Sequence, residues 1–318
     1  MIYLVWVPLL MPFLAVPAAR RLAAALPPRH AAWLLTAVAL VLAVSSSAAL
    51  VLLVVPGASY LPPVAVLGEL IEPLTAGPPA VTVALALTAG ALLVRHTAAL
   101  AAAVHRAHTE LRRARSATGG TDGELAVVRD SRPDAYALPG RPGRIVVTTG
   151  MLRALEPAER EALFAHERAH LRGRHHLFLT AAELAAHCHP ALRALCEPLR
   201  YALERAADEA AAAAVGDRRL AARAIGRAAL AARHGRDGEA HGPARPRAVL
   251  AATAGPVPRR VAALLGGAAS GPPVPPRTGR LIAGALLCCV TLSGATAVGA
   301  ANDLHTHIEI AQGESAAD

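Results

Sequence analysis

Five consecutive residues in the middle of the chain have the types and the spacing of a metal site. They read His166-Glu167-Arg168-Ala169-His170, an HExxH motif in a segment that favours a helix. Residues four apart lie on one face of a helix, so His166 and His170 can reach one metal ion. Zinc lowers the pKa of a bound water toward about 7, and Glu167 can take the proton of that water. The motif predicts zinc-dependent hydrolysis of a peptide bond.

A catalytic zinc site needs a third protein ligand and one open position. The better candidates are two acids in the run Leu203-Glu204-Arg205-Ala206-Ala207-Asp208. Glu204 and Asp208 are four apart and share a helix face. One can ligate zinc, while the other can accept a hydrogen bond from the outer nitrogen of a zinc histidine. None of the cysteines has a suitable place: Cys188, Cys196, Cys288 and Cys289.

Strands and helices must position these groups. Alternating apolar residues predict three short strands, which turn signals at Pro139-Gly140 and Pro142-Gly143 favour as a small antiparallel sheet. The strands are predicted at 124–129, 134–138 and 144–149. Helices are predicted at 157–172, 175–189, 197–215, 218–233 and 257–265. We expect a flexible loop at 235–255, which is rich in Gly, Pro and Arg. The whole fits an α+β, zincin-like catalytic domain.

Four apolar runs are long enough to cross a bilayer as helices. They cover residues 1–19, 31–55, 80–104 and 281–301, in a chain of 318 residues that is 54% hydrophobic. The first run carries Pro8, Pro12 and Pro17, and basic residues follow it rather than precede it, which is unlike a secretory signal. We therefore expect a retained helix whose prolines are tolerated because neighbouring helices satisfy its backbone. The predicted fold class is an α-helical integral membrane protein that carries the catalytic domain.

Charge is distributed unevenly about these runs. The chain has 32 basic residues, all Arg, and a net charge of +9. All of them fall in segments that the four runs place on one side, with a net charge of +15, while the other side carries only acids, for a net charge of −6. The positive-inside rule places the domain at 105–276 in the cytosol and both termini outside, including the short acidic tail at 302–318. Anionic lipid accounts for the basic charge, so we expect no nucleic-acid partner.

The segment before the motif resembles a known group of enzymes. Residues 135–140 (AYALPG) and 144–152 (RIVVTTGML) are similar to the segment that precedes HExxH in HtpX-like and CAAX-prenyl-protease-like membrane zinc peptidases. HExxH at His166 and ExxxD at Glu204 follow in that family's order. Three membrane helices before the domain look more like the BlaR-type branch, the peptidase modules of beta-lactam sensors. The resemblance covers about residues 135–216.

The resemblance implies a role for each site residue. His166, His170 and Glu204 would ligate one zinc ion, Glu167 would be the general base, and Asp208 would orient a zinc histidine. An edge strand, for which we favour 135–138, would pair with extended substrate. The chain departs from the family at Arg168, where an apolar residue is usual, and we expect that side chain to face away from the metal. No transition-state-stabilising His or Arg is identifiable beyond the ExxxD helix.

The sequence therefore predicts a membrane zinc metalloendopeptidase that acts on protein or peptide substrates, including membrane proteins. One alternative is a latent BlaR-type signalling peptidase that cleaves a transcriptional repressor in response to a membrane signal. About 17 residues follow the last apolar run, too few for the sensor domain of that branch, so direct recognition of a beta-lactam is not expected. The other alternative is a non-catalytic membrane scaffold that only resembles a peptidase.

Overall fold

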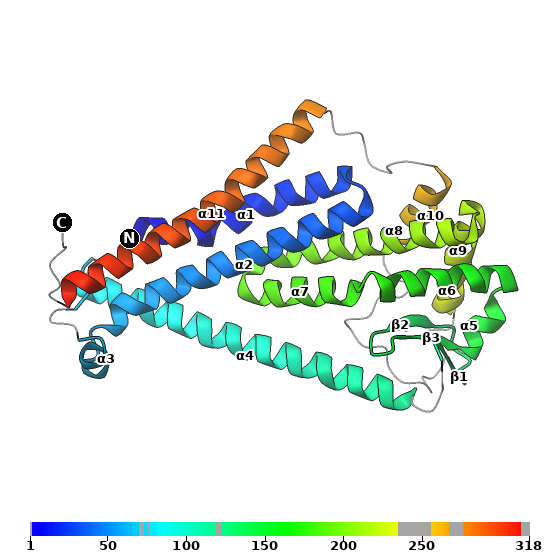
Figure 1. Cartoon of the computed structure of the whole chain (residues 1–318), viewed down its shortest axis with the longest axis horizontal. Coiled ribbons are helices and arrows are strands. Elements are labelled where there is room, and N and C mark those ends of the chain that lie inside the picture. The colour runs from blue at the N-terminus through cyan, green and yellow to red at the C-terminus, as the bar shows by residue number, and fades with distance from the viewer. Residues whose placement is uncertain are drawn as a thin grey trace.

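The computed structural model describes residues 2–69, 73–74, 77–118, 123–234, 256–266 and 276–312, and most of them are helical (Figure 1). The predicted loop at 235–255 and the end of the acidic tail, 313–318, lie outside the described residues. The helices are α1 (Ile2–Ala25), α2 (Pro28–Ala58), α3 (Pro62–Leu67), α4 (Pro79–Ala117), α5 (Thr149–Ala154), α6 (Pro157–Arg172), α7 (His175–Cys188), the 3-10 helix η1 (Pro190–Leu195), α8 (Cys196–Val215), α9 (Arg218–His234), α10 (Val257–Leu265) and α11 (Pro276–Ala311).

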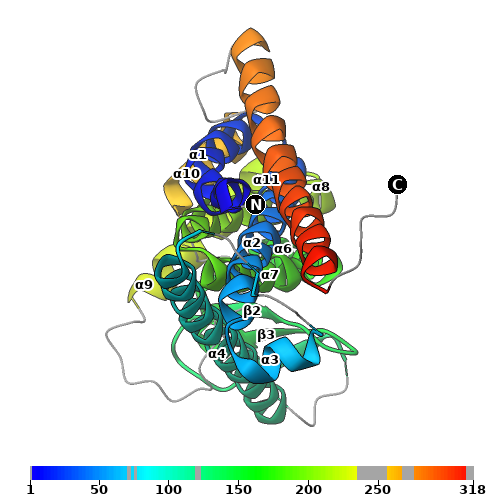
Figure 2. The ribbon, with the colours of Figure 1, turned by 90° about the vertical axis from the view of Figure 1, so that its left-hand side faces the viewer.

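Four of these helices are long and apolar enough to cross a membrane: α1, α2, α4 and α11. Helix α2 lies at the centre of their bundle, with α1 and α11 on one side and α4 on the other (Figures 1 and 2). Large apolar side chains such as Val44, Leu87 and Val94 point out of the bundle and are about two-thirds exposed, as lipid-facing residues would be. Successive helices run in opposite directions, so the start of α1 and the end of α11 lie at the same end, away from the sheet.

A neighbouring helix supplies the hydrogen bond that one proline of α1 removes, as the sequence predicts. Pro12 has no N–H, so the carbonyl of Pro8, four residues earlier, has no helical donor. Ser46 of α2 fills that place, because its hydroxyl donates to the Pro8 carbonyl oxygen over 2.8 Å. The serine is 1% exposed. A polar side chain in an apolar helix thus stabilises its proline-containing neighbour.

Helix α4 and helix α11 both extend beyond their apolar runs. Helix α4 continues without a break through residue 105 to Ala117, because no Pro or Gly interrupts the last three turns. Its final turns pack on one face of the sheet through Leu111 and Ala114, and Arg115 donates to the carbonyl of Pro139 over 2.7 Å. The α4 helix therefore connects the bundle of apolar helices to the sheet directly. Helix α11 likewise continues past residue 301 into the predicted acidic tail.

The sheet has three strands, β1 (Leu125–Val128), β2 (Ala135–Leu138) and β3 (Arg144–Thr148), in the order β1-β3-β2. The prediction of an antiparallel sheet is wrong for one pair, since β1 runs parallel to β3 while β2 is antiparallel to it. The β2–β3 turn brings those two strands together as a hairpin. The chain after β1 then crosses the end of β3, where the Asp130 carbonyl accepts from Thr149 Oγ1 and from the Gly150 amide, each over 2.8 Å. That crossing places β1 on the far edge in the parallel direction.

The second face of the sheet packs on α5 and α6. Ala135 and Val147 contact Met151, Leu155 and Leu163 there. Helix α6 begins with a capping box, in which the side chains of Glu156 and Glu159 bond the backbone of the first turn, and Pro157 occupies a first-turn position. Its start is therefore specified locally, while its buried face is specified by the sheet and α8.

Helices α7 and α8 form a hairpin that packs against the bundle of apolar helices. The break at η1 contains Pro190, and the hairpin lies beside α2 (Figure 1). Leu179, Leu199 and Leu203 share one apolar cluster with Leu35 and Leu42 of α2. Glu183, the acid within α7, pairs with Arg200 of α8 over 2.8 Å. The hairpin thus lies within the segment predicted as the catalytic domain, yet it packs on the bundle.

Candidate metal centre

The inner face of α6 carries the HExxH residues. Ala162, Leu163, His166, Glu167 and His170 recur at helical spacing, and all are at most 4% exposed. The two histidines lie one turn apart, with their Nε2 atoms 3.0 Å from each other. The helical period alone brings these two nitrogens together.

Helix α8 brings the third group. Glu204 Oε2 lies 3.5 Å from His166 Nε2, and Glu204 Oε1 lies 3.8 Å from His170 Nε2. One ligand atom from each of the three residues falls within 4.8 Å of the others. Within the part of the chain that the structure describes, this is the one group of His, Cys, Asp or Glu with such proximity. The structure therefore brings together the three residues predicted as ligands.

Asp208 holds the other side of His166. Its Oδ1 lies 3.0 Å from His166 Nδ1, and both side chains are fully buried. If the proton is on Nδ1, that N–H faces the Asp208 carboxylate, and Nε2 presents a lone pair toward Glu204. The sequence left the roles of Glu204 and Asp208 interchangeable by spacing. In the structure the Glu204 carboxylate, and not that of Asp208, faces the Nε2 atoms of both histidines.

Arg260 of α10 is a site residue that sequence reasoning missed. It is fully buried, and its Nη1 lies 2.6 Å from Glu204 Oε2. Its Nε and Nη2 bond the two Asp208 oxygens over 2.8 and 2.5 Å, a two-pronged pair. A signal existed in the sequence, because Arg260 shares the apolar face of α10 with Val257, Ala263 and Leu264. A charge on an apolar helix face implies a buried partner.

The electrostatics of the cluster follow from its burial. Burial by itself would lower the pKa of His166, but the neighbouring carboxylates of Asp208 and Glu204 raise it to about 9. Burial lowers the pKa of His170 well below its ordinary value, and it lowers that of His175 to about 4. Burial opposes the charge of Arg260 as well, yet Glu204 and Asp208 raise its pKa further. The pKa of Asp208 is lowered despite burial, because Arg260 and His166 donate to it.

The donor set fits a divalent cation. Three buried carboxylates, from Glu167, Glu204 and Asp208, outnumber the two buried cationic groups, which are the Arg260 guanidinium and the His166 imidazole with its raised pKa, so negative charge is in excess. Both Glu204 oxygens accept no hydrogen bond within the described residues, although Arg260 stands beside one of them. Buried unsatisfied carboxylate oxygens are costly unless a cation or donor meets them. Two imidazoles and one carboxylate are the ligands of a catalytic zinc site.

Arg168, the departure from the family pattern, faces away from this cluster. Its guanidinium forms a two-pronged pair with Glu124, next to β1, over 2.8 and 3.1 Å. Arg168 therefore connects α6 to the segment next to β1, and it does not belong to the buried face of α6.

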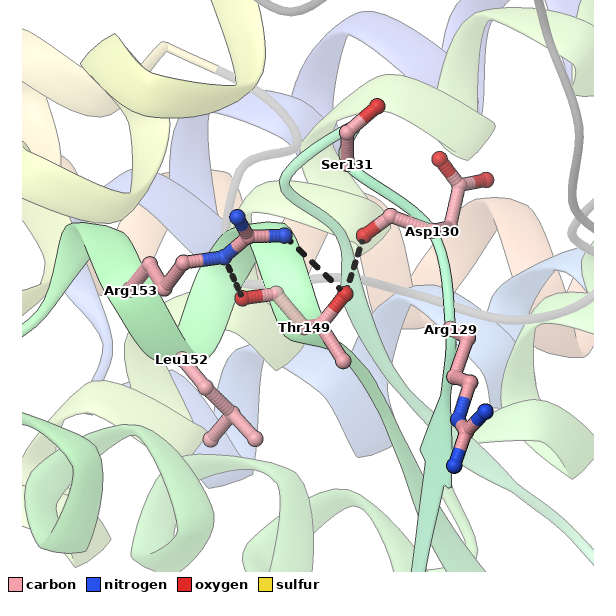
Figure 3. Close-up of a pocket in the computed structure, with 6 residues that line it drawn as sticks. All are labelled: Arg129, Asp130, Ser131, Thr149, Leu152 and Arg153. Carbon is pink, nitrogen blue, oxygen red and sulfur yellow. Dashed lines mark hydrogen bonds between the residues drawn. The ribbon is translucent and has the colours of Figure 1, made fainter.

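A separate pocket of about 640 Å³ lies between the β1–β2 connection and α5 (Figure 3). Its residues bond one another: Arg153 Nε donates to the Thr149 carbonyl over 3.2 Å, and Thr149 donates to Asp130. None of the metal-cluster residues lines it. The residues around it are Arg129, Asp130, Ser131, Thr149, Leu152 and Arg153.

The buried cluster of two histidines and one glutamate, on the packed helices α6 and α8 beside a small sheet, defines a candidate metal site. The model of peptidase family M48 matches residues 98–195, and this match supports the resemblance to HtpX-like or BlaR-like metallopeptidases that the sequence motifs suggested. The match runs from α4 to the end of η1, so it includes HExxH and stops just before α8. No curated protein and no solved structure matches the chain.

Proposed function

We propose that the chain is an integral-membrane zinc metalloendopeptidase whose site is formed by His166, His170, Glu204 and Glu167. The observation that carries the proposal is the meeting of two imidazoles and a carboxylate within 4.8 Å, all buried, with the buried Glu167 adjacent to His166 in α6. His166, His170 and Glu204 would hold the ion. When bound, zinc supplies Lewis acidity, which makes a water acidic and polarises a substrate carbonyl.

Each protein group has a defined task in this scheme. Glu167 takes a proton from the attacking water at a carboxylate oxygen and passes it to the leaving amine. Asp208 accepts from His166 Nδ1 and so keeps Nε2 of that ring available as a ligand. Arg260 compensates the Asp208 and Glu204 charges and fixes both carboxylates in place. The arrangement hydrolyses a peptide bond without a covalent intermediate on the protein.

The proposed substrate is an extended segment of a protein or peptide. Strand β2 is an edge of the sheet and packs beside α6, so it is positioned to pair with an extended chain. The length and apolar composition of the four bundle helices support a site next to a bilayer, which favours membrane proteins among the substrates. We assign the sheet end to the cytosol, because every Arg except Arg95, which lies within the third run, falls on that side of the four crossings.

The test is cleavage of an unfolded protein such as casein by the full-length chain in detergent. Wild type should cleave, a chelator should abolish cleavage, and zinc should restore it. Glu167→Gln should bind zinc as wild type does and cleave at least a thousandfold more slowly. Glu204→Gln should lose zinc, whereas Glu161→Gln, which changes an exposed acid of α6, should behave as wild type.

Activity that persists in Glu167→Gln would contradict the assignment of the base. Zinc binding in neither wild type nor any variant would contradict the enzyme and favour a membrane scaffold.

The second candidate is a latent signalling peptidase that cleaves a repressor on a membrane signal. It is favoured by one contact: Leu203, adjacent to Glu204, packs in the same apolar cluster as α1 and α2. A shift of those helices would therefore reach a proposed metal ligand. Zinc-bound wild type that cleaves no unfolded protein in detergent would favour this reading over constitutive proteolysis.

A further inference from the structure

The two histidines of α6 each have the outer ring nitrogen, Nδ1, held by another side chain. For His166 this neighbouring side chain is Asp208, whose Oδ1 lies 3.0 Å from Nδ1. For His170 it is His175, the first residue of α7, whose Nδ1 lies 2.7 Å from Nδ1 of His170. Both rings are buried, and they meet edge to face with their centres 4.7 Å apart.

The pairing determines where the protons are. Of two nitrogens at hydrogen-bond distance, one must donate and the other must accept. A neutral His170 that offers the Nε2 lone pair toward His166 and Glu204 carries its proton on Nδ1, and it therefore donates to His175. We infer that His175 is a positioning residue, which accepts from His170 Nδ1 and thereby fixes the tautomer and ring plane of that ligand. The inference rests on the proposed metal site.

The turn between α6 and α7 is shaped to place this ring. Gly173 leaves room for it, since a Cβ on that residue would lie 2.4 Å from His175 Nε2. Arg174 adopts a left-handed backbone with φ of +48°, which is unfavourable for a residue with a side chain. Such backbone strain persists where surrounding contacts require it. As a consequence, His175, the first residue of α7, lies against the His170 imidazole.

The other side of His175 is supported from the membrane bundle. The ring contacts Phe178 one turn later, with centres 6.5 Å apart, and Phe178 packs edge to face on Trp33 of α2, with centres 4.8 Å apart. Trp33 lies near the start of a helix that could cross the membrane. A continuous series of ring contacts thus joins His170 to α2, and loss of Phe178 should loosen His175 without removing its nitrogen.

The experiment measures metal binding by the full-length protein in detergent, by competition with a chromophoric chelator. His175→Ala should weaken zinc binding by about 10- to 100-fold. The visible spectrum of the Co²⁺-substituted protein, which reports ligand geometry, should change as well. His175→Asn should recover most of the affinity, because its amide oxygen can accept from His170 Nδ1. Phe178→Leu should have a smaller effect of the same kind.

The matched control is His176→Ala, which removes the neighbouring histidine and should leave affinity and spectrum unchanged. Equal zinc affinity and an unchanged Co²⁺ spectrum in His175→Ala, with wild type binding both metals, would overturn this inference alone. A His175→Asn variant no better than His175→Ala would also overturn it, since the accepting atom would then not matter. Wild type that binds neither metal would overturn the metal site and this inference together.

Discussion

Arg260 and Asp208 form a two-pronged, fully buried ion pair between α10 and α8, although 52 residues separate them along the chain. The pair connects the proposed metal site to a helix that the ExxxD motif does not contain. It also explains how Asp208 remains ionised at a position that water does not reach.

Removal of Arg260 should be strongly destabilising. Arg260→Gln leaves buried carboxylates without their counter-ion, and breaking one partner of a buried pair costs about 3–5 kcal/mol. Arg260→Lys should not restore stability, since an ammonium lacks the planar fork that bonds both Asp208 oxygens. Chemical unfolding in detergent, with zinc absent, measures the free energy of unfolding.

The control for this pair is Arg259→Gln, which removes the adjacent arginine, whose guanidinium lies over the Tyr201 ring. We expect it to cost less than about 1 kcal/mol. If Arg260→Gln and Arg259→Gln were equally mild, the buried pair would not matter to the fold.

The bond from Ser46 to the Pro8 carbonyl should stabilise the bundle by a modest amount. Hydrogen bonds between membrane helices contribute on average about 0.6 kcal/mol. Ser46→Ala should lower the free energy of unfolding by about that much, while Ser45→Ala, at a neighbouring buried serine, should not remove this bond.

A double-variant cycle tests the stated reason. Pro12→Ala restores the N–H that the Pro8 carbonyl lacks, so Ser46→Ala should cost less in that background than in wild type. Equal costs in both backgrounds would show that the proline does not create the need for Ser46.

The direction of the bundle helices predicts which residues are accessible from each side of the membrane. In a chain whose four cysteines are replaced by Ala, His307→Cys near the end of α11 and Arg29→Cys at the start of α2 are both exposed positions. A membrane-impermeant thiol reagent should label His307→Cys from outside and Arg29→Cys only from the cytosolic side. Sealed vesicles of known orientation provide the assay. Labelling of both from one side would contradict the proposed topology.

The pair between Glu124 and Arg168 predicts a small dependence of stability on acid. The hydrogen bond from Arg168 lowers the pKa of Glu124 below its ordinary value, against an opposing effect of burial. The stabilisation is therefore present above the unfolded pKa of about 4.3 and is lost as the pH falls through the lower folded value. Both side chains are at least one-third exposed, so the effect is at most about 1 kcal/mol. Glu124→Gln and Arg168→Gln should each remove it, and combining them should add nothing further.

What could be predicted from the sequence was local. The helical period places His166 above His170, and Glu204 above Asp208, whatever the rest of the chain does. Glu156-Pro157 begins α6, Gly216 follows the end of α8, and α10 spans the predicted residues 257–265. The four apolar runs similarly predict the four helices of the bundle. Each of these features depends on residues a few positions apart, so a single chain contains the information.

What only the tertiary structure decided depends on contacts between distant segments. The side of β3 on which β1 pairs is set by a connection that crosses the sheet, and local alternation is the same for either side. Glu204 and Asp208 have the same spacing in either role, and only the packing of α8 on α6 brings Glu204 to both Nε2 atoms. Arg260 and His175 belong to neither of the two sequence motifs, HExxH and ExxxD. They join the site because a buried carboxylate needs a counter-ion and a ligand imidazole needs a partner for its second nitrogen, and the fold supplies both from elsewhere.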